Sequence, residues 1–139
     1  MKQKEKKFTV SLQIKEHATL AKTPSYRVYF NNTLQCINDT FTCDLGHHTI
    51  KIQLLNKTDV DTEVDHQGKV LQDLAIELIS LKIDQFDITH NSKECAVYVD
   101  DKGTTIENTY GYMHKNGTLT ISFTCPAFYY TRNLNLIKK

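Results

Sequence analysis

The chain has 139 residues, which suits one domain; we predict it over residues 1–139, with a basic arm at 1–7 and a C-terminal tail at 127–139. The formal net charge is +1, and Arg27 and Arg132 are the only arginines, so nucleic acid is not an expected partner. No apolar run reaches the roughly 18 residues that cross a membrane, and no continuous apolar stretch near the N-terminus indicates a signal peptide. We therefore expect neither a membrane partner nor secretion.

Alternating apolar and polar side chains predict β-strands along the first half of the chain. Phe8, Val10, Leu12 and Ile14 recur at every second position, as the inward side chains of a half-buried strand do. The same pattern predicts further strands at 26–30, 33–45 and 50–54. The polar segment 56–69, which contains Gly68, is predicted to be a long loop.

The segment 70–84 fits two patterns. A helical spacing of apolar residues begins at Leu71, whereas alternation from Leu74 to Ile83 predicts a strand whose phase changes by one residue at Leu78–Ile79. Such a change of phase is the effect of a β-bulge. We favour the strand, because the neighbouring segments also have a period of two.

The second half of the chain continues the β pattern. We predict, in order, a turn at 84–87, a short strand from Ile88, a strand at 95–99, a second long loop at 100–117, and a last strand at 119–125 that Pro126 ends. Short strands separated by turn residues are typical of sandwiches. The expected fold is therefore an all-β antiparallel sandwich, with a jelly-roll topology as its finer form.

Acidic residues alternate in the first long loop, at Asp59, Asp61, Glu63 and Asp65. In an extended segment these carboxylates lie on one side, where their repulsion favours a bound cation, and oxygen ligands suit calcium. With Asp73 they form our candidate calcium site. A solvated acidic loop is the alternative, because the glycine and the final glutamate of an EF-hand loop are missing.

Tyrosine and phenylalanine provide all the aromatic residues, because the chain has no tryptophan. Exposed tyrosines are typical of binding surfaces, where a rigid ring supplies contact area and a polar edge. Our candidate interaction residues lie in the second long loop and in the tail: Tyr110, Tyr112, Phe128, Tyr129 and Tyr130. The alternative is a tail that folds back over the open end of the sandwich.

Cysteine and histidine residues give no recognisable site. Cys-x6-Cys-x3-His-His is not a normal zinc spacing, so we expect His47 and His48 to be exposed at the beginning of a strand. Free, buried thiols are the expected state of the four cysteines, Cys36, Cys43, Cys95 and Cys125. No nucleophile motif or phosphate loop occurs. We therefore expect no catalytic residues and no enzyme.

Two strands and the loop between them, HTIKIQLLN and QDLAIELISLKID, resemble the central part of calcium-dependent xylan-binding modules. In that family a strand that ends in Asn-Asp is followed by a polar loop and by a strand that opens with Asp. Asn56 and Asp73 match this pattern, whereas Lys57 replaces the second Asp and Gln85 the turn glycine. The resemblance covers 33–87 and implies a jelly-roll carbohydrate-binding module.

A second resemblance covers residues 48–130. The run NKTDVDTEVDHQGKV, the following strand, and NGT with an alternating strand and Pro126 are similar to small β-sandwich structural proteins of tailed bacteriophages. This resemblance implies a virion component that decorates the head or belongs to the neck, tail or baseplate. No site residue carries over from that group.

From these patterns we expect a non-catalytic structural or accessory protein of a tailed-phage particle, made in the host cytoplasm and located in the virion. Its expected partners are other virion proteins or further copies of itself. The alternative is a carbohydrate-binding module, with or without a calcium requirement, that recognises glycans of a host or a plant. Calcium is the one cofactor that the sequence suggests.

Overall fold

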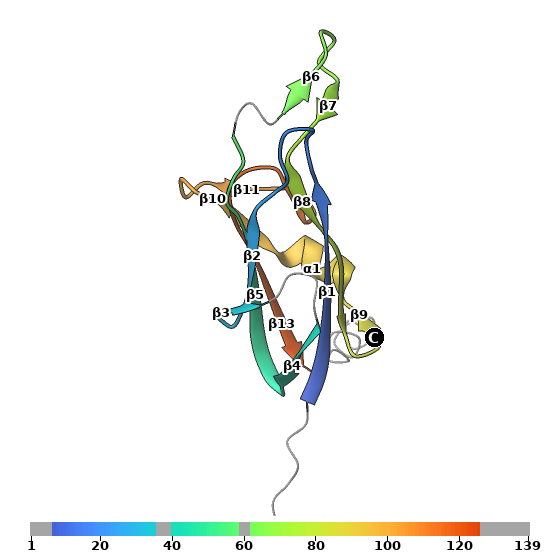
Figure 1. The fold of residues 1–139 in the computed structure, drawn as a ribbon. Helices are drawn as coiled ribbons and strands as arrows, with labels where there is room; N and C mark the ends of the chain where they lie inside the picture. Colours follow the sequence, from blue (N-terminus) through green and yellow to red (C-terminus); the bar gives the residue numbers. More distant parts are fainter. Residues whose placement is uncertain (1–6, 36–39, 59–61, 126–139) are drawn as a thin grey trace, which may run out of the picture.

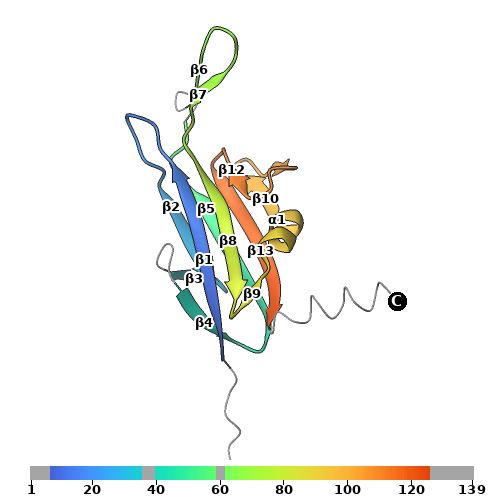
Figure 2. The same ribbon diagram turned by 90° about the vertical axis from the view of Figure 1, so that its right-hand side faces the viewer.

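The computed structural model describes residues 7–35, 40–58 and 62–125, which form an all-β sandwich (Figures 1 and 2). The first sheet has the order β12 (Tyr112–Met113), β8 (Ala75–Ile83), β1 (Lys7–His17) and β4 (Thr40–Asp44), and β9 (Phe86–Asp87) also pairs with β8. The second has the order β11 (Thr105–Ile106), β10 (Val97–Asp100), β13 (Gly117–Cys125), β5 (Gly46–Leu54), β2 (Tyr26–Phe30) and β3 (Thr33–Gln35). All pairings are antiparallel, so the predicted sandwich is confirmed, while its jelly-roll topology stays a prediction.

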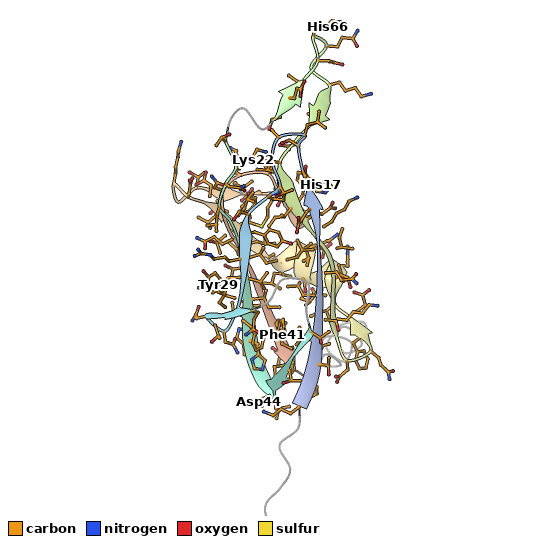
Figure 3. The ribbon with its side chains drawn as sticks, viewed as in Figure 1. His17, Lys22, Tyr29, Phe41, Asp44 and His66 are labelled. Atoms are coloured by element: carbon orange, nitrogen blue, oxygen red, sulfur yellow. The ribbon has the colours of Figure 1, made fainter. Side chains whose placement is uncertain are left out.

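A two-stranded hairpin projects from one end of the sandwich. It consists of β6 (Glu63–Val64) and β7 (Val70–Gln72), which pair with each other and, within the described ranges, with no strand of the two large sheets. Figure 1 shows it beyond the end of β1, and Figure 3 shows His66 at its tip. An isolated two-stranded hairpin is only marginally stable in water, so its attachment to the sandwich matters.

The core lies between the two sheets, where their alternating apolar side chains meet. Phe8, Val10, Leu12 and Ile14 of β1 are each at most 6% exposed, as the alternation predicts. The facing sheet contributes inward side chains at every second position of β5 and β13: Ile50, Ile52, Leu54, Leu119, Ile121 and Phe123. Burial of one such side chain contributes about 1.5–3 kcal/mol to stability.

The ambiguous segment 70–84 forms two strands in different sheets, β7 and β8, rather than one, and β8 has the predicted bulge. The register between β1 and β8 changes from Gln13 opposite Ser80 to Ile14 opposite Leu78. Ile79 therefore has no partner on β1, and its side chain is 41% exposed. The extra residue lets Leu78 and Leu81 both point into the core, although they are separated by an odd number of positions.

The predicted strand at 33–45 is two strands on different sheets. β3 lies at the edge of the second sheet and β4 at the edge of the first, and residues 36–39 between them lie outside the described ranges. Cys43 is buried as the alternation predicts, but Leu45 is 65% exposed. The alternation stops there because the chain turns into β5 at Gly46, which has a φ of +123°.

The expectation of a short strand from Ile88 is wrong, because α1 (Thr89–Cys95) begins directly after it. Asp87 Oδ1 accepts a hydrogen bond from the Thr89 backbone N–H at 2.9 Å, and the Thr89 hydroxyl accepts one from the Leu81 N–H at 2.8 Å. Ile88 is 6% exposed and fixes the helix start to the core. With seven residues, α1 is too short to show a helical period in the sequence.

The two predicted long loops contain short strands. The loop at 56–69 holds β6, and the loop at 100–117 holds β11 and β12. Each of these strands has two residues, and two residues cannot display an alternating pattern. Of these strands, β12 contributes to the candidate site, because it pairs with the start of β8 and brings Tyr112 to the base of the hairpin.

Candidate functional site

The hairpin is attached to the sandwich by an ion pair between Lys57 and Asp73. Lys57 follows β5 and Asp73 lies between β7 and β8, so the pair spans the base of the hairpin. The Lys57 ammonium donates to Asp73 Oδ1 and, at 2.7 Å, to the backbone oxygen of Leu74. The two side chains are only 10% and 18% exposed. Because little water reaches the two charges, each is stabilised mainly by the other.

Two further donors reach the Asp73 carboxylate. The Thr62 hydroxyl, from the other stem of the hairpin, donates to Oδ1 at 2.8 Å. The Tyr112 hydroxyl, from β12, lies 3.4 Å from Oδ2. Burial, and after it the nearby charge of Asp73, raises the pKa of Tyr112, so its hydroxyl keeps its proton and serves as a donor. Asp73 thus connects both stems of the hairpin to the first sheet.

Asn116 fixes the backbone of Lys57. The Lys57 N–H donates to Asn116 Oδ1 at 2.7 Å, and Asn116 Nδ2 donates to the Lys57 backbone oxygen at 2.8 Å. This side chain pairs with the backbone as a neighbouring strand would, just before β13 begins. These two hydrogen bonds fix the backbone of Lys57 in a position from which its ammonium group reaches Asp73.

A cavity of about 470 Å³ opens beside the ion pair. Its charged and titratable lining residues are three lysines, three aspartates and one histidine: Lys57, Lys102, Lys115, Asp73, Asp100, Asp101 and His114. With His114 neutral the formal charges of this lining cancel. The lining therefore has no excess of positive or negative charge that would attract a strongly charged ligand.

His114 lies between two tyrosine rings at this cavity. Its ring is 6.3 Å from that of Tyr112, nearly parallel to it, and 6.2 Å from that of Tyr98, edge-on. Burial, with the positive charges of Lys115 and Lys57, lowers the pKa of His114 below its ordinary 6.5. The imidazole is therefore neutral at pH 7 and packs as an aromatic ring.

The predicted calcium residues that the structure describes do not bring three potential ligand atoms together. Asp65 accepts hydrogen bonds from the backbone N–H groups of Gln67 and Lys69 at 2.8 and 2.9 Å, so it shapes the turn of the hairpin. Glu63 is exposed on β6, and Asp73 is paired with Lys57. The other two residues, Asp59 and Asp61, lie outside the described ranges. Calcium binding stays a prediction.

The predicted interaction tyrosines occupy different surroundings. Tyr112 is half-buried in the network described above, whereas Tyr110 is 58% exposed and has a φ of +50°. Tyr110 borders a cleft of about 480 Å³ between α1 and the segment 105–111. Phe128, Tyr129 and Tyr130 lie outside the described residues.

A second cluster lies at the end of the sandwich opposite to the hairpin. Ligand atoms of Cys43, His48 and Cys125 lie within 4.8 Å of one another, and all three side chains are buried. The expectation that His48 is exposed is wrong: it is 8% exposed, because it points inward in phase with Ile50 on β5. The position of His48 two residues before Ile50, in the same alternating pattern, was the sequence signal for its burial. No other group of three potential metal ligands occurs among the described residues.

The thiol expectation holds for two of the cysteines. Cys43 and Cys125 are free and buried, whereas Cys95 is free but exposed at the last residue of α1. Cys36 lies outside the described residues.

Comparison with known proteins gives no relative from which a function could be carried over. No protein-family model matches the chain, and neither a curated protein nor a solved structure matches it. Within the residues that the structure describes, no helix has the length and apolar character needed to cross a membrane. The functional argument therefore rests on the geometry of the chain itself.

Proposed function

We propose that this chain is a non-catalytic structural component of a tailed-phage particle, and that it contacts its neighbours in the particle through the hairpin β6–β7. The observation that carries this proposal is the position of the hairpin, which stands outside both large sheets at one end of the sandwich (Figure 2). The sequence resemblance to small virion sandwiches gives the kind of particle.

The surface of the hairpin supports a binding role. Val64 and Val70 are opposite each other across its two strands, and they are 53% and 55% exposed. Folding of the chain itself gains little from side chains that stay in water. A partner that covers both valines would gain that apolar burial and would add stability to a hairpin that is marginal by itself.

The base of the hairpin supports the same role. The ion pair of Lys57 and Asp73, with the hydrogen bond from Thr62, holds the two stems against the sandwich. A hairpin that is fixed at its base loses less conformational entropy when it docks. Rigid presentation of a small apolar contact suits repeated assembly into a particle.

Mass spectrometry of purified virions tests the proposal. Virions of the phage that encodes this chain should contain it in a constant ratio to the major capsid or tail subunit, after density-gradient purification removes unassembled protein. Virions that lack the chain would contradict a structural role in the particle.

Carbohydrate binding is a second candidate, which the cleft beside Tyr110 favours. An exposed ring beside polar groups, here Glu107, Asn108 and Thr109, has the apolar face and the hydrogen-bonding groups that a sugar ring requires. Affinity electrophoresis against xylan, cell-wall glycans and capsular polysaccharide, with and without a chelator, should then show retention. Tyr110→Ala should abolish that retention, and the matched exposed variant Phe86→Ala should keep it; absence of retention on every glycan would contradict this candidate.

A further inference from the structure

Two buried thiols face each other across the sandwich. Cys43 lies on β4 of the first sheet and Cys125 at the end of β13 of the second, and their sulfur atoms are 3.1 Å apart. The two residues are 5% and 1% exposed. They lie near Asp44, which Figure 3 labels at the end of the sandwich opposite to the hairpin. A disulfide would shorten this distance by about 1 Å, to roughly 2.05 Å.

The hydrogen bonds of His48 argue against a metal ion as the purpose of this cluster. Asn31 Oδ1 accepts from the Thr49 N–H at 2.9 Å, so the Asn31 amide group must present its nitrogen to His48 Nδ1, also at 2.9 Å. Nδ1 is therefore the acceptor, and Nε2 carries the proton that it donates to the Asp44 backbone oxygen at 2.7 Å. Both ring nitrogens are already engaged, so His48 has no lone pair to offer a metal.

We propose that Cys43 and Cys125 are a site of covalent modification, in which an oxidised low-molecular-weight thiol such as glutathione disulfide converts them into a disulfide between the two sheets. One cysteine thiolate attacks a sulfur of glutathione disulfide and releases one glutathione thiolate. The second cysteine thiolate then attacks the mixed disulfide and releases the other. The cysteine pair loses two electrons, which reduce the glutathione disulfide to two glutathione thiolates, and these take up the two protons of the cysteine thiols. This inference is independent of the proposed function.

The location of the pair sets the rate of the reaction. Burial raises the pKa of both thiols, so few thiolates form while the sandwich is closed. Among the described residues β4 is an edge strand that pairs with β1 alone, and its opening would expose Cys43 without unfolding the rest of the sandwich. We therefore expect slow oxidation that becomes faster as the pH rises.

The disulfide would have a large effect on stability. Cys43 and Cys125 are 82 positions apart, so the bond closes most of the chain into one loop and removes much of the conformational entropy of the unfolded state. We expect it to raise the melting temperature by on the order of 10 °C.

Equilibration of the folded chain with glutathione disulfide tests the inference, with unreacted thiols blocked under denaturing conditions. Peptide mapping should find a cross-linked peptide of Cys43 and Cys125, and the melting temperature should rise. The variant Cys36→Ser/Cys95→Ser, which keeps only this pair of cysteines, should behave in the same way. Cys43→Ala should lose both the cross-link and the oxidant-dependent rise.

Two results would overturn the inference. In the first, both thiols of the wild-type chain remain open to alkylation after prolonged equilibration, and the melting temperature does not change. In the second, native mass spectrometry of the chain with added Zn²⁺ shows one tightly bound ion that depends on Cys43 and Cys125 and prevents their oxidation, which would make the cluster a metal site.

Discussion

Lys57 and Asp73 form an ion pair that joins the end of β5, in one sheet, to the beginning of β8, in the other. The pair also closes the base of the hairpin that lies between them in the sequence. Both side chains are largely screened from water, so the pair acts as a structural connection rather than as a surface contact.

Replacement of Lys57 by methionine should destabilise the chain by about 2–3 kcal/mol, because the Asp73 carboxylate would stay buried without its counter-ion. Urea unfolding gives the change in the free energy of unfolding, and hydrogen exchange should show faster opening of β6 and β7. The double variant Lys57→Met/Asp73→Leu should recover part of the loss, because it leaves no unpaired charge. A loss for Lys57→Met no larger than that for the exposed control Lys102→Met would contradict this role.

Gly117, at the start of β13, should not tolerate a side chain. A Cβ atom there would lie 2.2 Å from the backbone oxygen of Val99 and 2.6 Å from the Cα atom of Asp100. We expect Gly117→Ala to cost at least about 3 kcal/mol, because two paired backbones would have to separate. Gly103→Ala, where the added atom meets open space, should cost about 1 kcal/mol from its positive φ alone. Thermal unfolding of both variants gives the comparison; equal losses would contradict the close approach.

His114 should make the chain less stable in mild acid. Its pKa in the folded state lies below 6.5, so the unfolded state binds a proton first as the pH falls through 6.5. The free energy of unfolding should therefore be unaffected by His114 above that pH and should decrease below it, until the folded state also becomes protonated. Urea titrations at several pH values should show a flatter acidic limb for His114→Gln. The exposed control His66→Gln should keep the wild-type slope, and an unchanged slope for His114→Gln would count against a depressed pKa.

Much of the fold was predictable from the sequence, because the strands that carry the core alternate clearly. β1, β5 and β13 follow directly from the spacing of their inward residues, and the bulge at Ile79 follows from a change of phase in β8. The elements that were missed or misjudged are short: α1 and the two-residue strands contain too few residues to show any period.

The contacts at the two ends of the sandwich were harder to predict, because they join residues that are distant in the sequence. The sequence marked Lys57 as a departure from a family pattern and Asp73 as a possible calcium ligand, but not that one neutralises the other. Cys43 and Cys125 are far apart in the sequence, and only the register of β13 and the position of β4 bring them together.

The exposed valines of the hairpin give the most direct test of the proposed function. If a neighbouring subunit covers Val64 and Val70, the loss of both side chains should weaken that contact by about 2–3 kcal/mol, or on the order of 100-fold in affinity. The variant Val64→Ser/Val70→Ser should still fold, because neither side chain belongs to the core. Ile79→Ser is the matched control, because Ile79 is an exposed apolar residue in the bulge of β8 and not in the hairpin.

The decisive measurement is the amount of the chain in purified virions when each variant replaces the wild-type protein during phage growth. We expect Val64→Ser/Val70→Ser to be present in soluble, folded form in the cell but strongly depleted from virions, while Ile79→Ser is incorporated at the wild-type level. Incorporation of the hairpin variant at the wild-type level would contradict the proposal that the hairpin contacts a neighbouring subunit.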